Sequence, residues 1–381
     1  MEEIKIIFAR DYSPVNRIES LASTGKYELI FNDLITELKD ADYSVVTLEC
    51  TLINESKTRN KVGPNIKVSE ENINALKYAN FKLAALGNNH IMDYGAEGLQ
   101  STIAACEKVG IDYMGAGDNL RTARKIQYKE IKGRRLAFLN FAANEFSTTD
   151  GPLPGANPIN SVTNFYDIQE ARNNADYVFI TVHGGNEDYK YPSPNKKKLF
   201  RYYIDIGATA VLCNHSHCIS GYELYRNGFI FYGLGNFVFD WFIDKRKMVD
   251  TPWNYGYIVK LCISTELTFS LIPYIQCSSK PGTWLLNSKE QDQFFITINE
   301  INSIIKNDKQ LEEEYQLLVL KKMKVYKIYF EPYFARILRI LLVIFPQISF
   351  LSKKKSLLLL NIIRCESHRE MIVRVLKLLS D

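Results

Sequence analysis

Short apolar runs, rich in Val, Ile, Leu and Phe, recur through the chain as far as about residue 275. Continuous runs of this length are typical of strands that are covered on both faces. They occupy residues 4–9, 44–48, 83–86, 135–141, 177–182, 210–212 and 229–232. Between them, mixed segments at 70–79, 98–109 and 195–206 have the spacing of helices, and 257–264 with 268–275 predict a hairpin. This alternation of strands and helices predicts an α/β fold.

The pattern changes after about residue 285. Residues 291–307, 310–329 and 359–379 carry Leu, Ile and Val at helical spacing, with Lys, Arg and Glu between them. We therefore predict an α/β domain over residues 1–284 and a helical C-terminal region over residues 285–381. The mixture of aromatic, Leu and basic residues over 325–360 favours a helix that lies on a membrane surface or on a partner. Packing of this face on the α/β domain is the alternative.

The composition is that of a globular protein, with 46% hydrophobic and 24% charged residues. A net charge of +4 over 381 residues is small, so we expect no nucleic-acid partner. The seven cysteines form no CxxC pair, which argues against a disulfide framework and is compatible with a reducing compartment. The N-terminus lacks the pattern of a signal peptide. We expect a cytoplasmic protein, either free or attached peripherally to a membrane.

Side chains that can bind a metal come where five of the predicted strands end. Parallel strands of an open α/β sheet bring such positions to one crevice, which is where ligands bind. The chain has five histidines, and only His368 lies outside these positions. The residues at the strand ends are Asp11, Glu49, Asn89, His90, His183, His215 and His217. Their spacing predicts a single metal cluster built from distant parts of the chain.

Carboxylate and amide oxygens with imidazole nitrogens, and no thiolate, suit Mn²⁺, Fe²⁺ or Zn²⁺. Two such cations need a shared anionic ligand to offset their repulsion, and Glu49 is the candidate for it. A different interpretation assigns Cys213, His215, His217 and Cys218 to a local zinc site. Their spacing does not match the usual structural zinc patterns, and this site would leave the other strand ends unexplained.

Several of these segments resemble the CapA family of capsule and poly-γ-glutamate synthesis proteins. Residues 88–95 (Asn-Asn-His-Ile-Met-Asp-Tyr-Gly) resemble the family's Asn-Asn-His-x-x-Asp-Tyr-Gly motif. Residues 115–117 match its Gly-Ala-Gly segment, 183–189 are similar to His-Trp-Gly-x-Glu-Tyr, and 206–217 to the stretch that ends in His-Pro-His. Residues 232–240 resemble Ser-Leu-Gly-Asn-Phe-x-Phe-Asp. In this order, the motifs cover most of residues 4–275.

The resemblance implies a fold and a metal centre. CapA proteins are similar to calcineurin-like metallophosphoesterases, which implies a four-layer α/β/β/α sandwich followed by the helical C-terminal region. It implies two divalent metal ions, with Asp11 and His217 on one ion, Asn89, His183 and His215 on the other, and Glu49 bridging. Among the remaining residues, it implies catalysis by His90 with Asp93, and substrate binding by Asn88, Glu187 and Asn236.

The chain departs from the family pattern beside these residues. Arg10 stands where the family has the Gly before Asp11, and Ser216 replaces the Pro of His-Pro-His. The Asp-x-His start that is common in metallophosphoesterases is absent, because Ser13 stands two residues after Asp11. These changes affect the loops around the expected ligands and leave the ligands themselves in place.

Three functions agree with these expectations. The first is a metal-dependent phosphoester hydrolase. The second, implied by the family, is a protein for making an anionic surface polymer, whose metal centre binds an anionic intermediate or hydrolyses γ-glutamyl amide bonds. The third is a non-catalytic, metal-binding accessory subunit that docks on a membrane synthase through its C-terminal helices. The expected substrate is an anionic small molecule or polymer in each catalytic case.

Overall fold

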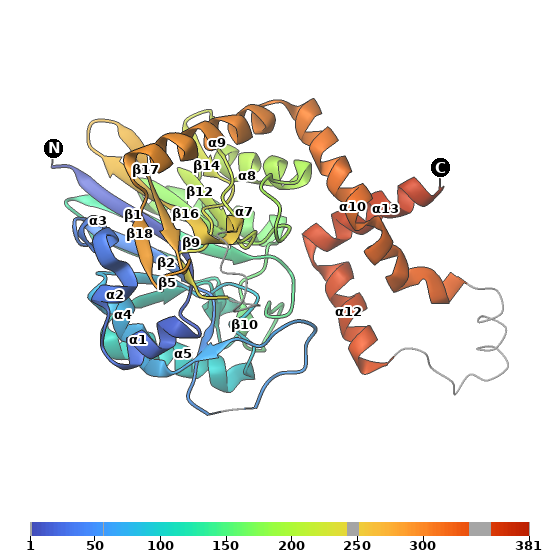
Figure 1. The fold of residues 1–381 in the computed structure, drawn as a ribbon, viewed down its shortest axis with the longest axis horizontal. Coiled ribbons are helices and arrows are strands. Elements are labelled where there is room, and N and C mark those ends of the chain that lie inside the picture. The colour runs from blue at the N-terminus through green and yellow to red at the C-terminus, as the bar shows by residue number, and fades with distance from the viewer. Residues whose placement is uncertain (1, 56, 242–250, 335–351, 381) are drawn as a thin grey trace.

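The computed structural model describes residues 2–55, 57–241, 251–334 and 352–380, and it contains two large β-sheets stacked face to face (Figure 1). The first sheet has eight strands in the order β18-β17-β16-β1-β2-β5-β6, with β15 beside β1. Its strands are β1 (Ile4–Ser13), β2 (Tyr43–Leu48), β5 (Leu83–Ala85), β6 (Asp112–Met114), β15 (Val238–Phe239), β16 (Tyr255–Ile263), β17 (Leu267–Gln276) and β18 (Thr283–Leu285). Strands β1, β2, β5 and β6 are parallel.

The second sheet has six strands in the order β13-β14-β12-β11-β9-β8. Its strands are β8 (Gln127–Ile131), β9 (Arg134–Ala142), β11 (Tyr177–His183), β12 (Ala210–Asn214), β13 (Tyr222–Tyr225) and β14 (Gly228–Phe231). Strands β9, β11, β12 and β14 are parallel. Two short pairs complete the strands, β3 (Thr51–Leu52) with β4 (Lys67–Val68) and β7 (Ala116–Gly117) with β10 (Gly155–Ala156).

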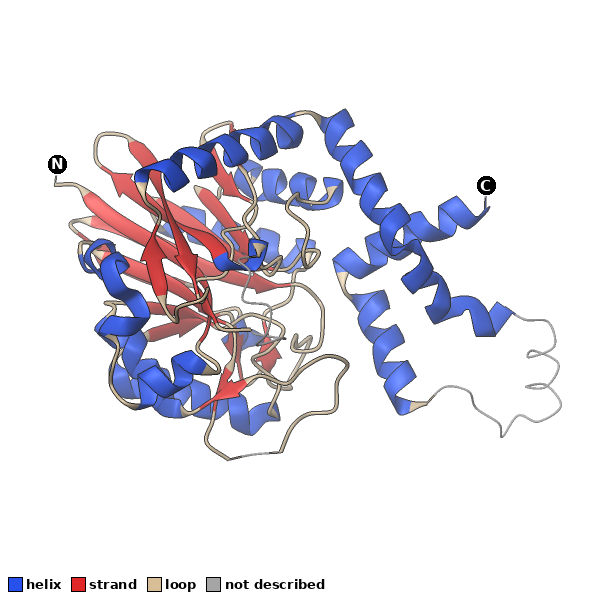
Figure 2. Ribbon diagram, in the orientation of Figure 1, coloured by secondary structure: helices blue, strands red, loops and turns tan. Residues whose placement is uncertain are grey.

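Helices cover the outer face of each sheet (Figure 2). The first sheet is covered by α1 (Arg17–Ser23), α2 (Glu28–Phe31), α3 (Ile35–Lys39), α4 (Ile73–Tyr78) and α5 (Gly95–Val109). The second is covered by α7 (Ser161–Asn174) and α8 (Pro194–Asp205). A short helix, α6 (Leu120–Ala123), and 3₁₀ turns at Asn32–Leu34, Glu70–Asn72 and Pro252–Asn254 lie in the connections.

The alternation of apolar side chains along β1 explains the layers. Ile6 and Phe8 belong to the core between the two sheets, whereas Ile7 and Ala9 belong to the core under the helices. Phe8 meets Phe179 of the other sheet, with 5.6 Å between the ring centroids. Both faces of the sheet are therefore buried, and the predicted four-layer α/β/β/α sandwich is confirmed.

The C-terminal region contains α9 (Ser288–Lys306), α10 (Asp308–Phe334), α12 (Lys353–Arg364) and α13 (Glu366–Ser380). Helix α9 packs on the body of the protein through Ile298 and Ile301. Helices α10, α12 and α13 share a small core of their own that includes Tyr315, Ile362 and Met371. The division of the chain at residues 284 and 285 stays a prediction.

One helix prediction in this region is wrong. The single helix expected over 359–379 is two helices, because the backbone at Cys365 is extended, with φ −68° and ψ 125°. Part of the expected interfacial segment, residues 335–351, lies outside the described residues. Within the described residues, no helix has the length and apolar character that crossing a membrane requires.

Candidate metal centre

Five strands from the two sheets bring the candidate ligands to one place. Glu49 directly follows β2, His183 is the last residue of β11, and His215 directly follows β12. All three strands are parallel members of their sheets, so their carboxyl ends meet at the same end of the sandwich. His217 and Asn89 lie in the loops that follow β12 and β5. The candidate ligands therefore lie at or after the ends of strands, as expected, with one exception.

The exception is Asp11, which lies inside β1 and does not follow it. The pairing of β1 with β2 runs from Ala9 opposite Val46 to Tyr12 opposite Leu48, so β1 has an extra residue there. This is a β-bulge, and Asp11 has a positive φ of 32° within it. The bulge turns the carboxylate towards the other sheet without ending the strand.

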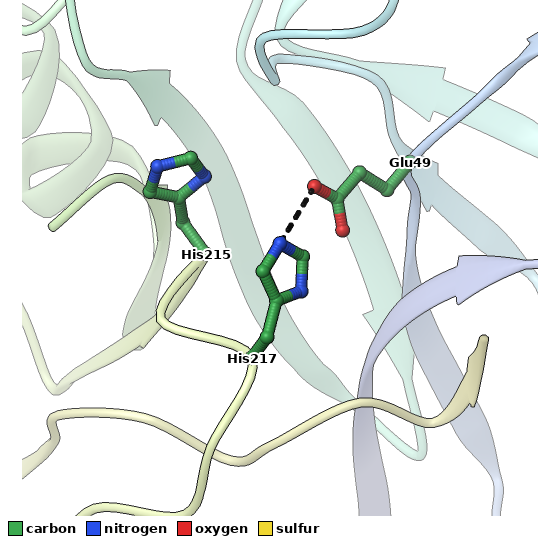
Figure 3. A group of neighbouring side chains, drawn as sticks. All are labelled: Glu49, His215 and His217. Carbon is green, nitrogen blue, oxygen red and sulfur yellow. Dashed lines mark ion pairs between the residues drawn. The ribbon is translucent and has the colours of Figure 1, made fainter. Parts of the chain in front are cut away.

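The loop after β12 has a strained backbone. His215 and His217 have φ values of 99° and 57°, in the region that residues other than glycine rarely adopt. Such conformations persist only where the surroundings fix them, and they gather at functional sites. In Figure 3, both rings come from this one loop, while Glu49 reaches towards His217 from the end of β2.

The side chains form two overlapping groups that share Glu49, namely Glu49 with His215 and His217, and Glu49 with Asp11 and His183. Within each group, the potential ligand atoms lie within 4.8 Å of one another. Glu49 Oε1 is 3.3 Å from His183 Nε2 and 3.9 Å from His217 Nε2. The carboxylate of Asp11 is 3.6 Å from His183 Nδ1 and 3.8 Å from His217 Nδ1. Glu49 is thus the residue that the two groups have in common.

Asn89 joins the same cluster. Its Oδ1 is 3.0 Å from His183 Nε2, and His215 Nδ1 is 3.1 Å from that same nitrogen. Asn89 and His215 therefore both contact His183, the third residue predicted to share their ion, and Glu49 is also beside His183.

Buried atoms without partners show that this cluster suits a cation. Both carboxylate oxygens of Glu49, Asp11 Oδ1 and His183 Nδ1 are buried and have no hydrogen-bond partner. Burial and the nearby Asp11 raise the pKa of Glu49 well above its usual value. Burial, with the neighbouring His215 and His217, lowers the pKa of His183 well below its usual value. A divalent cation would pair these atoms and offset the cost of burying them. The cluster is therefore compatible with metal binding.

His90 lies beside the cluster and is bound to Asp93. His90 Nδ1 is 2.7 Å from Asp93 Oδ2, which also accepts a hydrogen bond from the backbone N–H of Ile66 at 2.7 Å. The ammonium of Lys61 forms an ion pair with Asp93 and lies 3.2 Å from His90 Nδ1. Burial lowers the pKa values of both His90 and Lys61. Asp93 thus holds Nδ1 of the His90 imidazole, and the other ring nitrogen, Nε2, is not part of this contact.

The residues predicted to bind substrate differ in their surroundings. Asn88 is buried and donates to Leu48 O at 2.8 Å, while its Oδ1 accepts from the N–H of His90 at 2.9 Å. Asn236 Oδ1 is 2.8 Å from His217 Nδ1, so this side chain orients a candidate ligand. Glu187 is exposed. The amides of Asn88 and Asn236 therefore hold the centre together, and the substrate-binding role of all three stays a prediction.

Glu145 is a member of the site that the sequence interpretation missed. Its Oε1 is 3.2 Å from His215 Nε2. Burial would raise the pKa of Glu145, but the charge of His215 and their hydrogen bond lower it to about 2. Burial lowers the pKa of His215, but Glu145 raises it to about 9. Glu145 comes soon after β9, so the strand-end rule could have found it, whereas Lys61 lies in a charged loop with no such signal.

The alternative zinc site is not supported. The buried thiol of Cys213 donates to Gly184 O at 3.3 Å. Among the described residues, neither group with the geometry of a metal site contains a cysteine. Cys213 instead belongs to the core between the second sheet and its helices.

The sequence is similar to those of known bacterial proteins. The sequence profile of a family described as bacterial capsule synthesis protein PGA_cap matches residues 5–241. A capsule biosynthesis protein CapA from Bacillus anthracis is 32% identical over 250 residues, which are 63% of this chain and 60% of that protein. A PGA biosynthesis protein CapA from Bacillus subtilis is 34% identical over 179 residues, 46% of this chain and 47% of that protein. The chain thus spans 60% or less of the length of these two relatives.

Solved structures are more distant. A putative 5'-nucleotidase from Staphylococcus aureus aligns with 82% of this chain and 58% of its own, at 11% identity and a TM-score of 0.44. A 5'-nucleotidase from Candida albicans aligns with 71% of this chain and 51% of its own, at 13% identity and a TM-score of 0.39. The family profile covers more than half of the chain and includes every candidate ligand, and on that basis the chain belongs to the bacterial capsule synthesis protein family PGA_cap.

Proposed function

We propose that the protein is a metal-dependent hydrolase that acts on an anionic substrate in the synthesis of a capsule or a poly-γ-glutamate polymer. The observation that supports this most is the carboxylate of Glu49. Both of its oxygens are buried without a hydrogen-bond partner, and the potential ligand atoms of His183, His215 and His217 lie within 4.8 Å of it. An arrangement of this kind is costly for stability alone, but it is the arrangement that a bridging ligand between two cations needs.

The proposed ligands divide between two divalent ions. Asp11 and His217 would hold one ion, Asn89, His183 and His215 the other, and Glu49 both. The donor set is oxygen and imidazole nitrogen, which suits Mn²⁺, Fe²⁺ or Zn²⁺. Bound there, such ions would supply an acidified water and a positive clamp on the oxygens of a phosphoryl centre.

The chain's own residues would supply proton transfer. With Nδ1–H donated to Asp93, His90 in its imidazolium form would pass the second ring proton, on Nε2, to the oxygen of the leaving group and become neutral. Lys61 neutralises part of the charge on Asp93 and packs against the same imidazole. Arg10 is buried below the centre, where it donates to Thr47 Oγ1 at 2.8 Å and to Leu212 O at 2.6 Å. Arg10 thus ties the two sheets together next to Asp11.

A substrate screen tests this function. The full chain, stripped of metal and reloaded with Mn²⁺, Fe²⁺ or Zn²⁺, should hydrolyse either phosphoesters or γ-glutamyl amides, and the chelated protein should not. Nitrophenyl phosphate, bis-nitrophenyl phosphate and a γ-glutamyl oligomer form the minimal set. Metal analysis of each sample shows whether turnover follows metal content. A chain that binds metal fully and hydrolyses none of these classes would contradict the hydrolase proposal.

A non-catalytic accessory role is the second candidate, and exposed apolar side chains on the C-terminal helices favour it. Leu317 on α10 and Ile363 on α12 are 60% and 62% exposed. Together with the basic residues of these helices, they would suit a membrane surface or a synthase subunit. Binding of the full chain to anionic vesicles at low salt, without metal-dependent turnover, would favour this role over the first.

Glu145 should tune the affinity of the centre for metal. Its carboxylate fixes His215 and makes the imidazole more basic, as partners of metal-bound histidines generally do. Changing Glu145→Gln should weaken metal binding by about 10- to 100-fold. Competition with a chelating dye at fixed pH measures this change. The control Asp167→Asn, whose carboxylate pairs with Arg124 instead, should leave the affinity as it was. If Glu145→Gln and the unchanged chain bind metal with equal affinity, Glu145 does not contribute to the metal centre.

A further inference from the structure

The turn between α12 and α13 lies against the loop that carries Glu145. Glu366, the first residue of α13, accepts hydrogen bonds from the backbone N–H of Asn144 at 3.0 Å and from its side-chain amide at 2.6 Å. Arg364, at the end of α12, donates to Thr148 Oγ1 at 3.2 Å. These contacts bracket Glu145 in the sequence, and Figure 1 shows α12 and α13 beside the loops at this end of the body.

The same loop contacts two of the proposed metal ligands. Glu145 is 3.2 Å from His215, and Ser147 Oγ donates to the backbone oxygen of Asn89 at 2.8 Å. One side of the loop therefore faces the metal centre and the other side holds the C-terminal helices. This places the helices next to the centre, although the matched family segment ends at residue 241.

His368 lies in the first turn of α13, the helix whose first residue contacts the loop of Glu145. It follows Glu366 by two positions, and its Nδ1 is 2.7 Å from the hydroxyl of Tyr326 on α10. The charges of Glu145 and His215 both act on the pKa of His368, which burial lowers. In the described part of the chain, its Nε2 has no hydrogen-bond partner. The imidazole is thus held by α10 and keeps one polar atom available.

We propose that the turn between α12 and α13 caps the metal centre and that His368 binds an anionic group of the substrate outside the metal ions. This inference rests on the proposed function. In the tautomer that the proposal requires, Nδ1 accepts from the Tyr326 hydroxyl, and the ring proton on Nε2 is donated to an anionic oxygen. A phosphate oxygen and a carboxylate oxygen share this chemistry, so the ligand class is an anion of either kind.

The cap contacts the body through a small number of polar groups. Besides Glu366 and Arg364, Ser193 at the start of α8 donates to Glu370 Oε2 at 2.7 Å. A cavity of about 770 Å³ separates α13 from α8, lined on the body side by Gly184 and Leu199 and on the cap side by Arg369 and Val373. The position of His368 therefore depends on a few hydrogen bonds that single substitutions can remove.

Kinetics of His368→Ala in the full, metal-loaded chain test the proposal. KM for a phosphoester or γ-glutamyl substrate should rise about tenfold, the usual worth of one hydrogen bond to a charged group, while kcat changes by less than about twofold. Metal content should stay unchanged. His368→Gln, which keeps a donor near Nε2, should recover most of the affinity, and Tyr326→Phe should show a smaller rise in KM. Leu376→Ala, an exposed change on the same helix, is the control.

Calorimetric titration with inorganic phosphate and with a short γ-glutamyl peptide separates the two sources of the anion. If the unchanged chain binds either ligand without turning over any substrate, the hydrolase proposal fails, and weaker binding by His368→Ala still supports the cap. Equal KM and equal ligand affinity in His368→Ala and the unchanged chain would overturn the cap. A metal-loaded chain that binds neither anion would overturn it as well, because His368 would have nothing to bind.

Discussion

Replacing Glu49 by Ala should leave the purified chain without bound divalent metal and without metal-dependent activity. Glu49 is the residue that both candidate metal groups share, and its Oε1 lies 3.3 Å from His183 Nε2 and 3.9 Å from His217 Nε2. Without this shared anion, two cations a few ångströms apart would repel each other with nothing between them. His215→Ala should have the same effect, because it also removes a proposed ligand. The bound metal is measured by elemental analysis after exhaustive dialysis against a buffer that contains a trace of the metal.

The stability of the metal-free variants separates a lost ligand from a lost fold. The buried oxygens of Glu49 have no hydrogen-bond partner, and burial raises the pKa of this carboxyl, so the group is costly in the metal-free chain. Metal-free Glu49→Gln should therefore unfold at the same temperature as the metal-free parent, or higher. Glu71→Ala, a change at an exposed acid, should keep both metal and activity. Full metal content in Glu49→Ala would refute the bridging assignment.

The apolar runs predicted strands that are buried on both faces because the runs are long and continuous, whereas the four-layer arrangement came from the family resemblance. Runs such as residues 135–141 and 177–182 became β9 and β11. Short or polar elements had no such signal. Strand β8 has a single clearly exposed position and no buried one. Helix α7 has few apolar residues. Its start is marked instead by an N-cap, in which the side chain of Asn160 accepts from the N–H groups of Val162 and Thr163.

The sequence predicted those residues of the candidate site that lie at the ends of parallel strands. Glu49, His183 and His215 follow from the rule that parallel strands share a carboxyl edge. The bulge at Asp11 was not predictable, because it arises from the register between β1 and β2 and not from either strand alone. The position of His368 depends on the break between α12 and α13 at Cys365, after which the side chain of Glu366 accepts from the N–H of Asn144. Such long-range contacts have no local pattern in the sequence.

A change at His90 should separate proton transfer from metal binding. His90 is bound to Asp93 and Lys61, and it belongs to neither candidate metal group. His90→Ala should therefore keep nearly all of the bound metal while kcat falls by roughly 10²- to 10⁴-fold, the usual contribution of a positioned proton donor. His90→Asn is the matched variant, because it keeps a polar side chain near Asp93. Metal analysis and steady-state kinetics on the same preparations give the two readouts.

The leaving group provides the internal control for this assignment. A nitrophenolate departs without a proton, whereas an alkoxide needs one, so His90→Ala should lose much less activity on a nitrophenyl ester than on an alkyl ester. A loss of the same size on both substrates would mean that His90 positions the substrate and donates no proton. If His90→Ala empties the centre as His215→Ala does, His90 is a ligand. In that case, Asp93 and Lys61 orient a metal-bound imidazole, since Asp93 already holds its Nδ1 at 2.7 Å and leaves only Nε2 to bind an ion.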